Sequence, residues 1–269
     1  MIGKLFRRRG PAPASRRAAT PPDTVIWAVG DVHGRLDLLK PLVEAVLADL
    51  ATATAARRVL VFLGDYIDRG PDSRGVLDLL IRLKSQVGIE TRFLRGNHED
   101  RMEAFMTQAD LGPGWCDYGG REALMSWGVT PPMLKTDAVG WAGACEALNA
   151  AVTPDQRAFL RDQESGLVIG DYFFAHAGAR PGVPLARQDP QDLMWMRGAF
   201  LDHPAPFEQV VVHGHTPSET VHADHRRIGI DTGGYATGVL TALRLEGEAR
   251  EVLQTSGGGA RVALSRRPL

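Results

Sequence analysis

Five short apolar segments, each adjoining a glycine and a residue type that binds metal, constrain this chain more than any other feature. The segments span residues 24–29, 59–63, 90–94, 167–175 and 209–212. Their apolar and β-branched composition predicts β-strands. They lead into Gly30-Asp31-Val32-His33, Gly64-Asp65, Gly96-Asn97-His98, His176-Ala177-Gly178 and His213-Gly214-His215. Because ligands of open α/β sheets bind at the carboxyl ends of the strands, we expect these polar residues to meet at one site.

Segments of helical spacing alternate with the first of these strands, which predicts an α/β fold. The helical segments span residues 35–50, 73–84 and 99–108. After Arg226 the pattern changes to closely spaced strand-like pieces at 227–230, 238–245 and 250–253, which indicates an antiparallel edge or a second sheet. Residues 107–163 interrupt the alternation with helical stretches and several prolines, and we interpret them as a helical insertion in a single domain over 24–255.

The two ends of the chain differ in character from this predicted domain. Six basic residues precede the first acidic residue, Asp23, and we interpret residues 1–23 as a basic flexible leader. Contact of this leader with nucleic acid or acidic lipid is the alternative. Residues 256–269, with their glycine run, are expected to form a flexible tail. Without the leader the chain is acidic, which argues against nucleic acid as the main partner.

Composition excludes several further classes of protein. No segment approaches the roughly 20 apolar residues of a membrane-spanning helix, so we expect a soluble, cytoplasmic protein without a membrane span. Only Cys116 and Cys145 are present, and neither lies in a Cys/His pattern. A disulfide framework and a thiolate zinc cage are therefore disfavoured.

The residues at the strand ends offer carboxylate, imidazole and amide ligands but no thiolate. This set suits a divalent ion such as Mn, Fe or Zn. It exceeds the needs of one ion and fits two ions that share one carboxylate, a charge arrangement suited to phosphate. A water held by two such ions has its pKa lowered toward neutrality and becomes a nucleophile. Each motif alone is weak, but their combination predicts a two-metal site.

These motifs resemble those of the calcineurin-like metallophosphoesterases, in particular the bacterial and phage branch of the phosphoprotein phosphatases. The resemblance extends from Asp31 to Pro217, and Asp231-Thr232-Gly233 is also similar. It implies an αββα sandwich with a binuclear centre at the sheet edge. It also implies two divalent ions, most simply Mn, held by Asp31, His33, Asp65, Asn97, His176 and His215. Asp65 would be the shared ligand.

Further site residues follow from the same resemblance. Arg69 would bind phosphate, and His98, steered by Asp68, would act as general acid toward the leaving oxygen. Arg197 resembles a second phosphate-binding arginine, and Arg180 is a further candidate for substrate binding. Spacing alone leaves His213 open as a metal ligand, although the Gly-His-Thr pattern selects His215.

The resemblance implies a phosphatase in which a metal-bridging hydroxide attacks phosphorus directly. Covalent alternatives lack support, because the chain has no cysteine-phosphatase motif, no nucleophile elbow and no nucleotide P-loop. We expect a Ser/Thr-type protein phosphatase acting on phosphorylated protein or a small phosphoester. The alternative is a bis(5'-nucleosyl)-tetraphosphatase, for which the insertion's tryptophans could stack on bases. The third hypothesis is a non-catalytic scaffold of the same fold.

Overall fold

The computed structural model describes residues 17–259 and 261–269, and two β-sheets form its centre. The larger sheet has the strand order β11-β10-β9-β1-β2-β3 and the smaller has the order β4-β5-β6-β8-β7. The larger sheet comprises β1 (Thr24–Val29), β2 (Arg57–Phe62), β3 (Glu90–Phe93), β9 (Val239–Glu246), β10 (Ala249–Gly258) and β11 (Arg261–Pro268). The smaller comprises β4 (Gly166–Ile169), β5 (Tyr172–Ala175), β6 (Val210–His213), β7 (His222–Ala223) and β8 (Arg227–Gly229). Both sheets mix parallel and antiparallel pairs.

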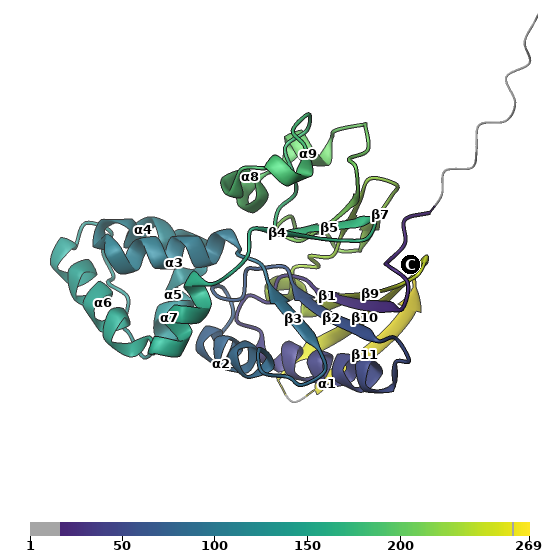
Figure 1. The fold of residues 1–269 in the computed structure, drawn as a ribbon. Coiled ribbons are helices and arrows are strands. Elements are labelled where there is room, and N and C mark those ends of the chain that lie inside the picture. Colours follow the sequence, from purple (N-terminus) through teal and green to yellow (C-terminus); the bar gives the residue numbers. More distant parts are fainter. Residues whose placement is uncertain (1–16, 260) are drawn as a thin grey trace, which may run out of the picture.

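Helices cover the outer faces of both sheets (Figure 1). Those beside the larger sheet are α1 (Leu36–Thr52) and α2 (Ser73–Leu83), and α10 (Gly234–Thr237) precedes β9. The smaller sheet carries η3 (Leu185–Arg187), α8 (Pro190–Trp195) and α9 (Gly198–Leu201). The remaining helices are α3 (Asn97–Thr107), η1 (Ala109–Leu111), α4 (Gly112–Trp115), η2 (Cys116–Gly120), α5 (Arg121–Ser126), α6 (Ala138–Ala151) and α7 (Pro154–Arg161).

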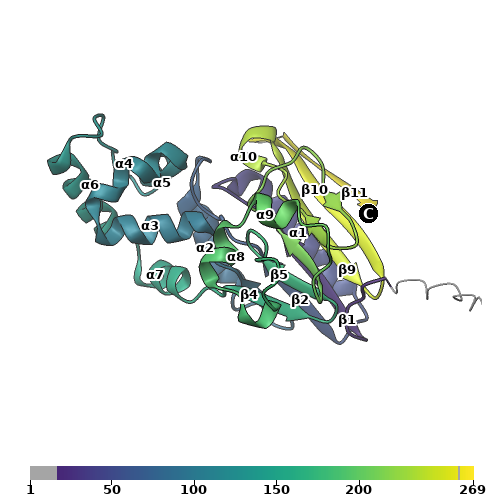
Figure 2. The same ribbon diagram turned by 90° about the horizontal axis from the view of Figure 1, so that it is seen from above.

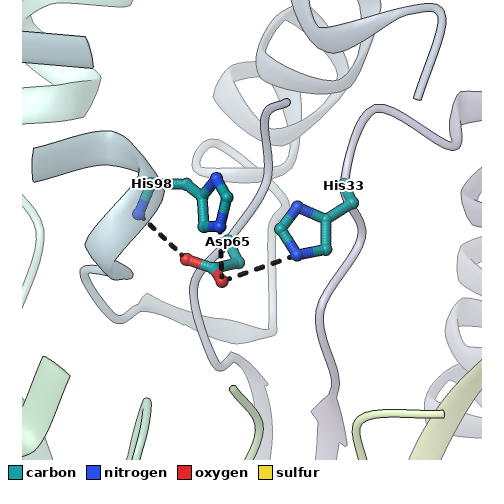
Figure 3. Close-up of side chains that lie close together, drawn as sticks. All are labelled: His33, Asp65 and His98. Carbon is teal, nitrogen blue, oxygen red and sulfur yellow. Dashed lines mark hydrogen bonds and ion pairs between the residues drawn. The ribbon is translucent and has the colours of Figure 1, made fainter. Parts of the chain in front are cut away.

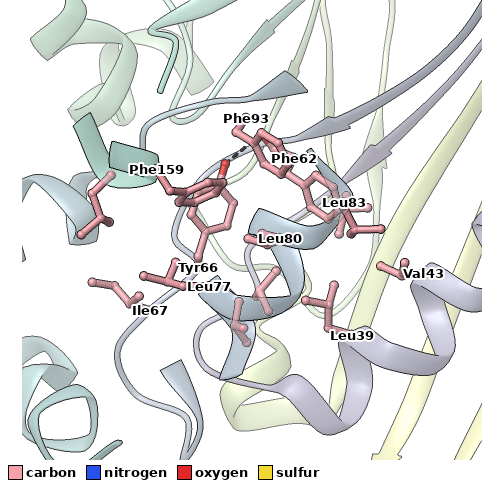
Figure 4. Close-up of a cluster of buried hydrophobic side chains, with 14 of the residues drawn as sticks. Leu39, Val43, Phe62, Tyr66, Ile67, Leu77, Leu80, Leu83, Phe93 and Phe159 are labelled. Atoms are coloured by element: carbon pink, nitrogen blue, oxygen red, sulfur yellow. Dashed lines mark hydrogen bonds between the residues drawn. The ribbon is translucent and has the colours of Figure 1, made fainter. Parts of the chain in front are cut away.

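The side-chain alternation of β1 explains how the layers hold together. Trp27 and its neighbours on one face pack against α1 and α2, whereas Ile26 and Ala28 on the other face pack against the smaller sheet. Figure 4 shows part of the first core, where Phe62 stacks on Phe93 with ring centroids 5.3 Å apart. A third cluster joins the outer face of the smaller sheet to α8 and α9. The layers are therefore helix, sheet, sheet and helix, which confirms the predicted αββα sandwich.

The helical insertion projects from one side of this sandwich, where α3 to α7 lie together (Figures 1 and 2). Its three tryptophans are Trp115, Trp127 and Trp141, and each is at most 4% exposed. The idea that these rings stack on substrate bases is wrong, because they form the core of the insertion.

Two sequence-based expectations about strands need correction. Residues 167–175 were expected as one strand but form the antiparallel pair β4 and β5, because Gly170 adopts a left-handed φ of 59° and turns the chain. The expected flexible tail at 256–269 is also wrong. There β10 continues to Gly258, and β11 pairs with it from Glu251↔Pro268 to Gly258↔Arg261.

The physical basis of the C-terminal strand is mainly polar. Arg266 pairs with Glu251 at 2.6 Å and with Asp49 at 2.7 Å, and its guanidinium lies 5.6 Å from the ring of Trp27. These contacts anchor an edge strand that is largely exposed, so its sequence shows little apolar alternation.

The expected leader lies partly outside the described residues, which begin at residue 17. The part that is described, residues 17–23, packs against the fold: Thr20 is buried, and its backbone N–H donates to the carbonyl of Gly247. Over the described ranges, no helix is long and apolar enough to cross a membrane.

Candidate metal centre and its surroundings

The polar residues predicted at the strand ends converge at one edge of the two sheets. Each follows a strand of the sandwich, and Asn97 is the first residue of α3. Across the described chain, six residues other than glycine have positive φ, and five of them lie in these loops. They are His33, Asp65, Asp68, Arg69 and His215, with φ between 45° and 73°. Left-handed backbone is uncommon for such residues, and its clustering here indicates a functional site.

Asp65 lies between two groups of histidines. In the first group, shown in Figure 3, its Oδ2 is 3.6 Å from Nε2 of His33 and 3.8 Å from Nε2 of His98. The backbone N–H of His98 also donates to Oδ1 of Asp65 at 3.1 Å. In the second group, Oδ1 of Asp65 lies 3.3 Å from Nε2 of His176, which is 3.2 Å from Nδ1 of His215. Asp65 is thus the one carboxylate that both groups share.

Hydrogen bonds to backbone carbonyls fix the ring orientations of His33 and His176, so that Nε2 of each ring faces the carboxylate of Asp65. Nδ1 of His33 lies 2.8 Å from the carbonyl oxygen of Ile67, and Nδ1 of His176 lies 2.9 Å from that of Leu63. A carbonyl only accepts hydrogen bonds, so Nδ1 carries the proton and Nε2 of each neutral ring presents a lone pair. A lone pair facing a carboxylate is unfavourable unless a cation lies between them: at His33, whose pKa is lowered, that cation would be a metal ion, whereas at His176 Asp65 outweighs burial and raises the pKa, so that a proton serves in the absence of metal.

Two further oxygens complete the set of donor atoms. Oδ1 of Asn97 lies 3.0 Å from Nε2 of His176. Oδ2 of Asp31 accepts the backbone N–H of His215 at 2.9 Å, whereas Oδ1 of Asp31 is buried without a hydrogen-bond partner. Such an orphaned oxygen fits a metal ligand.

The electrostatics of the site also call for cations. Burial raises the pKa of Asp31 well above its usual value, with further contributions from Asp231 and Asp65. Burial likewise raises the pKa of Glu99 to about 7 and that of Asp231 to about 6. These three carboxyl groups lack enough positive charge, which divalent ions would supply. At Asp65 itself, burial is outweighed by His176 and His98, which hold its pKa well below the usual value.

Burial lowers the pKa values of His33 and His215 at this site, whereas at His176 the neighbouring Asp65 outweighs burial and raises the pKa. Burial, followed by the neighbouring His98, lowers the pKa of His33 to about 3, and burial together with His176 lowers that of His215 to about 2. Both rings are therefore neutral at physiological pH, as metal ligation requires.

His98 differs from His33 and His176 because its Nδ1 contacts a carboxylate, that of Asp68, rather than a backbone carbonyl. Its Nδ1 lies 2.6 Å from Oδ2 of Asp68, and the same oxygen accepts the indole N–H of Trp115 at 2.8 Å. Burial lowers the pKa of His98, but Asp65 and Asp68 outweigh burial and raise it. Distance alone would also permit His98 as a metal ligand. Its fixed orientation and raised pKa favour a proton-donating role.

Three arginines lie near the centre and have no acidic partner among the residues that the structure describes. Nε of Arg197 donates to Nε2 of His215 at 3.0 Å. The guanidinium of Arg69 lies 4.4 Å from the ring of Tyr235, and its Nε is buried without a partner. Arg101 is the third arginine. In the part of the chain that the structure describes, no carboxylate oxygen lies within 4.0 Å of the charged nitrogens of these arginines.

Arg101 bridges two parts of the molecule and was not anticipated from sequence. Its guanidinium lies 4.0 Å from the ring of Tyr118 in the insertion and 4.9 Å from the ring of Trp195 in α8. The ring of Trp195 is in turn 6.4 Å from that of His215, so this bridge adjoins the metal centre. One sequence signal was available: Arg101 stands four residues after Asn97 on α3 and so shares its face.

Two other sequence candidates lie in different environments. Arg180 is exposed and pairs with Asp192 at 2.5 Å, so its charge is already neutralised. Nδ1 of the buried His213 lies 3.0 Å from the carbonyl of Gly214, and its Nε2 lies 3.1 Å from a guanidinium nitrogen of Arg227. His213 lies outside both groups of side chains whose donor atoms converge on Asp65, and its two ring nitrogens contact Gly214 and Arg227 instead.

Comparison with known proteins agrees with this architecture. The family model of the calcineurin-like phosphoesterases matches residues 24–243, and the chain belongs to this family. Family membership confirms the predicted class of enzyme, a hydrolase of phosphoric esters, and family members use a binuclear metal centre.

Individual relatives have different printed activities. The chain is 26% identical to the asymmetrical bis(5'-nucleosyl)-tetraphosphatase PrpE of Anoxybacillus flavithermus, over 80% of this chain and 88% of that protein. It is 34% identical to the serine/threonine-protein phosphatase BSL2 of Arabidopsis thaliana, over 26% of this chain and 7% of that protein. A cold-active protein-tyrosine phosphatase of a Shewanella species shares the fold, with a TM-score of 0.57 at 18% identity over 93% of this chain and 83% of that chain.

Proposed function

We propose that this protein hydrolyses phosphomonoesters at a two-metal centre, with phosphoserine and phosphothreonine of proteins as its main substrate class. Two divalent ions, Mn in the simplest case, would be held by Asp31, His33, Asp65, Asn97, His176 and His215. Orphaned Oδ1 of Asp31 and the facing lone pairs of His33 and His176 support this ligand set. When bound, the ions would offset phosphate charge and activate water for direct attack on phosphorus.

The protein's own side chains would orient the phosphate and its leaving group. Arg69 and Arg197 adjoin the centre from opposite loops and have no acidic partner among the described residues, so their guanidinium groups are available to grip phosphate oxygens. His98 would donate its proton from Nε2 to the leaving oxygen, because Nδ1 is engaged by Asp68.

The observation that best supports phosphoserine and phosphothreonine as substrates is that Asp68 is hydrogen-bonded to both His98 and Trp115. An alkoxide leaves phosphorus poorly and needs a proton, whereas a nucleotide phosphate leaves with little help. A buried, doubly hydrogen-bonded carboxylate that orients an imidazole is therefore most useful against serine and threonine esters. Exposed apolar side chains of the insertion, Met133 at 87% and Leu134 at 66%, also offer contacts for a protein.

Dinucleoside polyphosphates are the second candidate, and a separate observation favours them. Arg101 is a third guanidinium near the metal centre that has no acidic partner within the described ranges, and the rings of Tyr118, Trp195 and Tyr235 lie beside Arg101 and Arg69. Several phosphates and two bases would find charge and stacking surfaces there. The printed activity of the Anoxybacillus relative agrees with this candidate.

A comparison of two substrates separates these candidates. With Mn present we expect kcat/KM for phosphoserine peptides to exceed that for diadenosine tetraphosphate, as measured by chromatography of the products. Chelation should abolish both activities, and added Mn should restore them. A higher kcat/KM for diadenosine tetraphosphate than for any phosphopeptide would replace the first candidate by the second. Absence of turnover on either substrate by the metal-loaded protein would leave the scaffold hypothesis.

Replacing Arg101 tests whether its charge contributes to the binding of a polyphosphate substrate. Arg101→Met keeps the length of the side chain but removes its charge. We expect kcat/KM for diadenosine tetraphosphate to fall about 10-fold to 100-fold, the worth of a charge-assisted contact. The rate on p-nitrophenyl phosphate should change by less than about twofold, because one phosphate is held by Arg69 and Arg197.

Arg180→Met is the matched control, since Arg180 is already paired with Asp192. This substitution should leave the rates on diadenosine tetraphosphate and on p-nitrophenyl phosphate unchanged. An equal loss on both substrates in Arg101→Met would show that Arg101 supports the metal centre rather than the additional phosphates.

A further inference from the structure

A second polar pocket lies behind the metal centre, on the smaller sheet. It has a volume of about 140 Å³, and its lining comes from α9, β6, β7, β8 and the loop after His215. Since one water takes about 30 Å³ of liquid, the pocket has room for a small tetrahedral anion. Its polar lining residues are His213, Thr216, Ser218, His222, Arg227 and Asp231.

Arg227 carries a charge that the surrounding protein compensates only in part: burial lowers the pKa of its guanidinium, and the charges of Asp224 and Asp202 do not fully offset that effect. One guanidinium nitrogen donates to Nε2 of His213, a ring whose pKa burial lowers to about 3 and which is therefore neutral. Nε of Arg227 is buried without a hydrogen-bond partner. Over the described residues, no carboxylate oxygen lies within 4.0 Å of this guanidinium. A partly buried guanidinium in this state is costly unless an anion accompanies it.

The acidic side chains that the structure describes around Arg227 do not pair directly with its guanidinium, although Asp224 accepts the backbone N–H of Arg227 at 2.9 Å. Asp224 pairs with Arg226 at 2.7 Å and with His222 at 3.2 Å. Asp231 lines the pocket, but one of its oxygens accepts the backbone N–H of Gly233 at 2.8 Å. Asp231 is the one repulsive group for an anion in the lining.

Hydroxyl and backbone features favour a ligand with several oxygens. The hydroxyl of Thr216 is buried without a partner, and Ser218 contributes a second hydroxyl. Gly229 has no side chain to cover Arg227. A Cβ at this position would lie 3.1 Å from the ring of His213 and 3.6 Å from a guanidinium nitrogen of Arg227. Arg227, Thr216 and Ser218 could therefore donate to one anion together.

We propose that this pocket binds a tetrahedral oxyanion, such as inorganic phosphate or the phosphate group of a small molecule, through Arg227. The pocket contains none of the proposed metal ligands, although Asp231 lines it and also acts on the proposed ligand Asp31, and the proposal does not depend on which phosphoester is hydrolysed at the metal centre. The pocket is connected to that centre by hydrogen bonds. Arg227 donates to His213, and Nδ1–H of His213 donates to the carbonyl of Gly214, which directly precedes His215. An anion that draws Arg227 away from His213 would loosen this support.

Calorimetric titration of the full-length, Mn-loaded protein with inorganic phosphate tests the proposal. Two binding events are expected for the natural protein, one at the metal centre and one at Arg227. Arg227→Gln should abolish the second event or weaken it at least about 10-fold, and Arg227→Lys should weaken it less. Arg250→Gln is the control and should retain both events. A single event in the natural protein, or two unchanged events in Arg227→Gln, would overturn the proposal.

Thermal unfolding without phosphate separates binding from a structural role. Arg227→Gln should unfold at the same temperature as the natural protein or higher, because it removes an uncompensated charge. A lower unfolding temperature together with a retained second event would assign Arg227 to structure alone. Should Arg227→Gln fail to fold, Ser218→Ala at the exposed edge of the pocket should weaken the second event severalfold, and no change would count against the site. Titration with the phosphonate analogue of phosphoserine, which has no ester bond to hydrolyse, distinguishes a bound phosphate group from the free anion: a second event that Arg227→Gln weakens is expected if the pocket accepts a substituted phosphate, and its absence would restrict the site to the free anion.

Discussion

Replacing Asp65 with asparagine should reduce phosphatase activity by at least about 10³-fold, because this carboxylate is shared by both groups of metal-binding side chains. Asparagine keeps the size of the side chain, and its amide can still accept the backbone N–H of His98 at the position of Oδ1. The charge that two cations share would be lost. Elemental analysis of the purified variant should therefore show the loss of at least one equivalent of metal per chain.

Asp72→Asn is the matched control for this experiment. Asp72 caps α2 by accepting the backbone N–H of Gly75 at 2.8 Å, and asparagine caps helices equally well. Metal content and turnover should stay at natural levels in this control. Near-normal turnover with two metals bound in Asp65→Asn would refute the assignment of Asp65 as the shared ligand.

The replacement of His98 by alanine should separate proton donation from metal binding. We expect both metals to remain bound, since His98 is not in the proposed ligand set. On a phosphoserine peptide the rate should fall about 10²-fold to 10⁴-fold, the usual contribution of a general acid. On p-nitrophenyl phosphate the loss should stay below about 10-fold, because the phenolate leaves without much help.

His225→Ala serves as the control, because His225 is exposed and lies outside the strand-end loops. Equal losses on the two substrates in His98→Ala would count against the general-acid role. Loss of a metal equivalent would place His98 among the ligands, as its 3.8 Å distance from Asp65 also allows.

The sequence was most informative about the strand ends, where the sheet topology and the chemistry of a ligand site both require polar residues after an apolar segment. A ligand crevice at the carboxyl ends of strands requires apolar runs that lead into polar residues, and this repeated pattern located Asp31, Asp65 and His176 together. The family model confirms the predicted family, and the two sheets confirm the predicted sandwich. The roles assigned to individual site residues stay predictions until the variants are measured.

Features that depend on contacts distant in sequence could not be predicted. The strand β11 is held by Arg266, whose partners Asp49 and Glu251 stand 217 and 15 residues away. Its side chains are mostly exposed and do not alternate between apolar and polar, so the glycine run before it led us to expect a flexible tail. The contact of Arg101 with Trp195 likewise joins residues 94 positions apart, and no local sequence motif predicts it.

The hydrogen bond from Trp115 to Asp68 has a consequence for how such enzymes can be recombined. The helical insertion looks like a module that could be exchanged between relatives, since it projects from the sandwich (Figure 2). Yet it contributes the indole that holds Asp68, and the carbonyl of Gly119 accepts the backbone N–H of Arg69 at 3.0 Å. Gly119 has a φ of 106°, and a Cβ there would lie 2.5 Å from Arg69. A chimera that receives a foreign insertion would therefore need an indole and a glycine at these two places, or it would acquire new surface contacts while losing the contacts that hold Asp68 and Arg69.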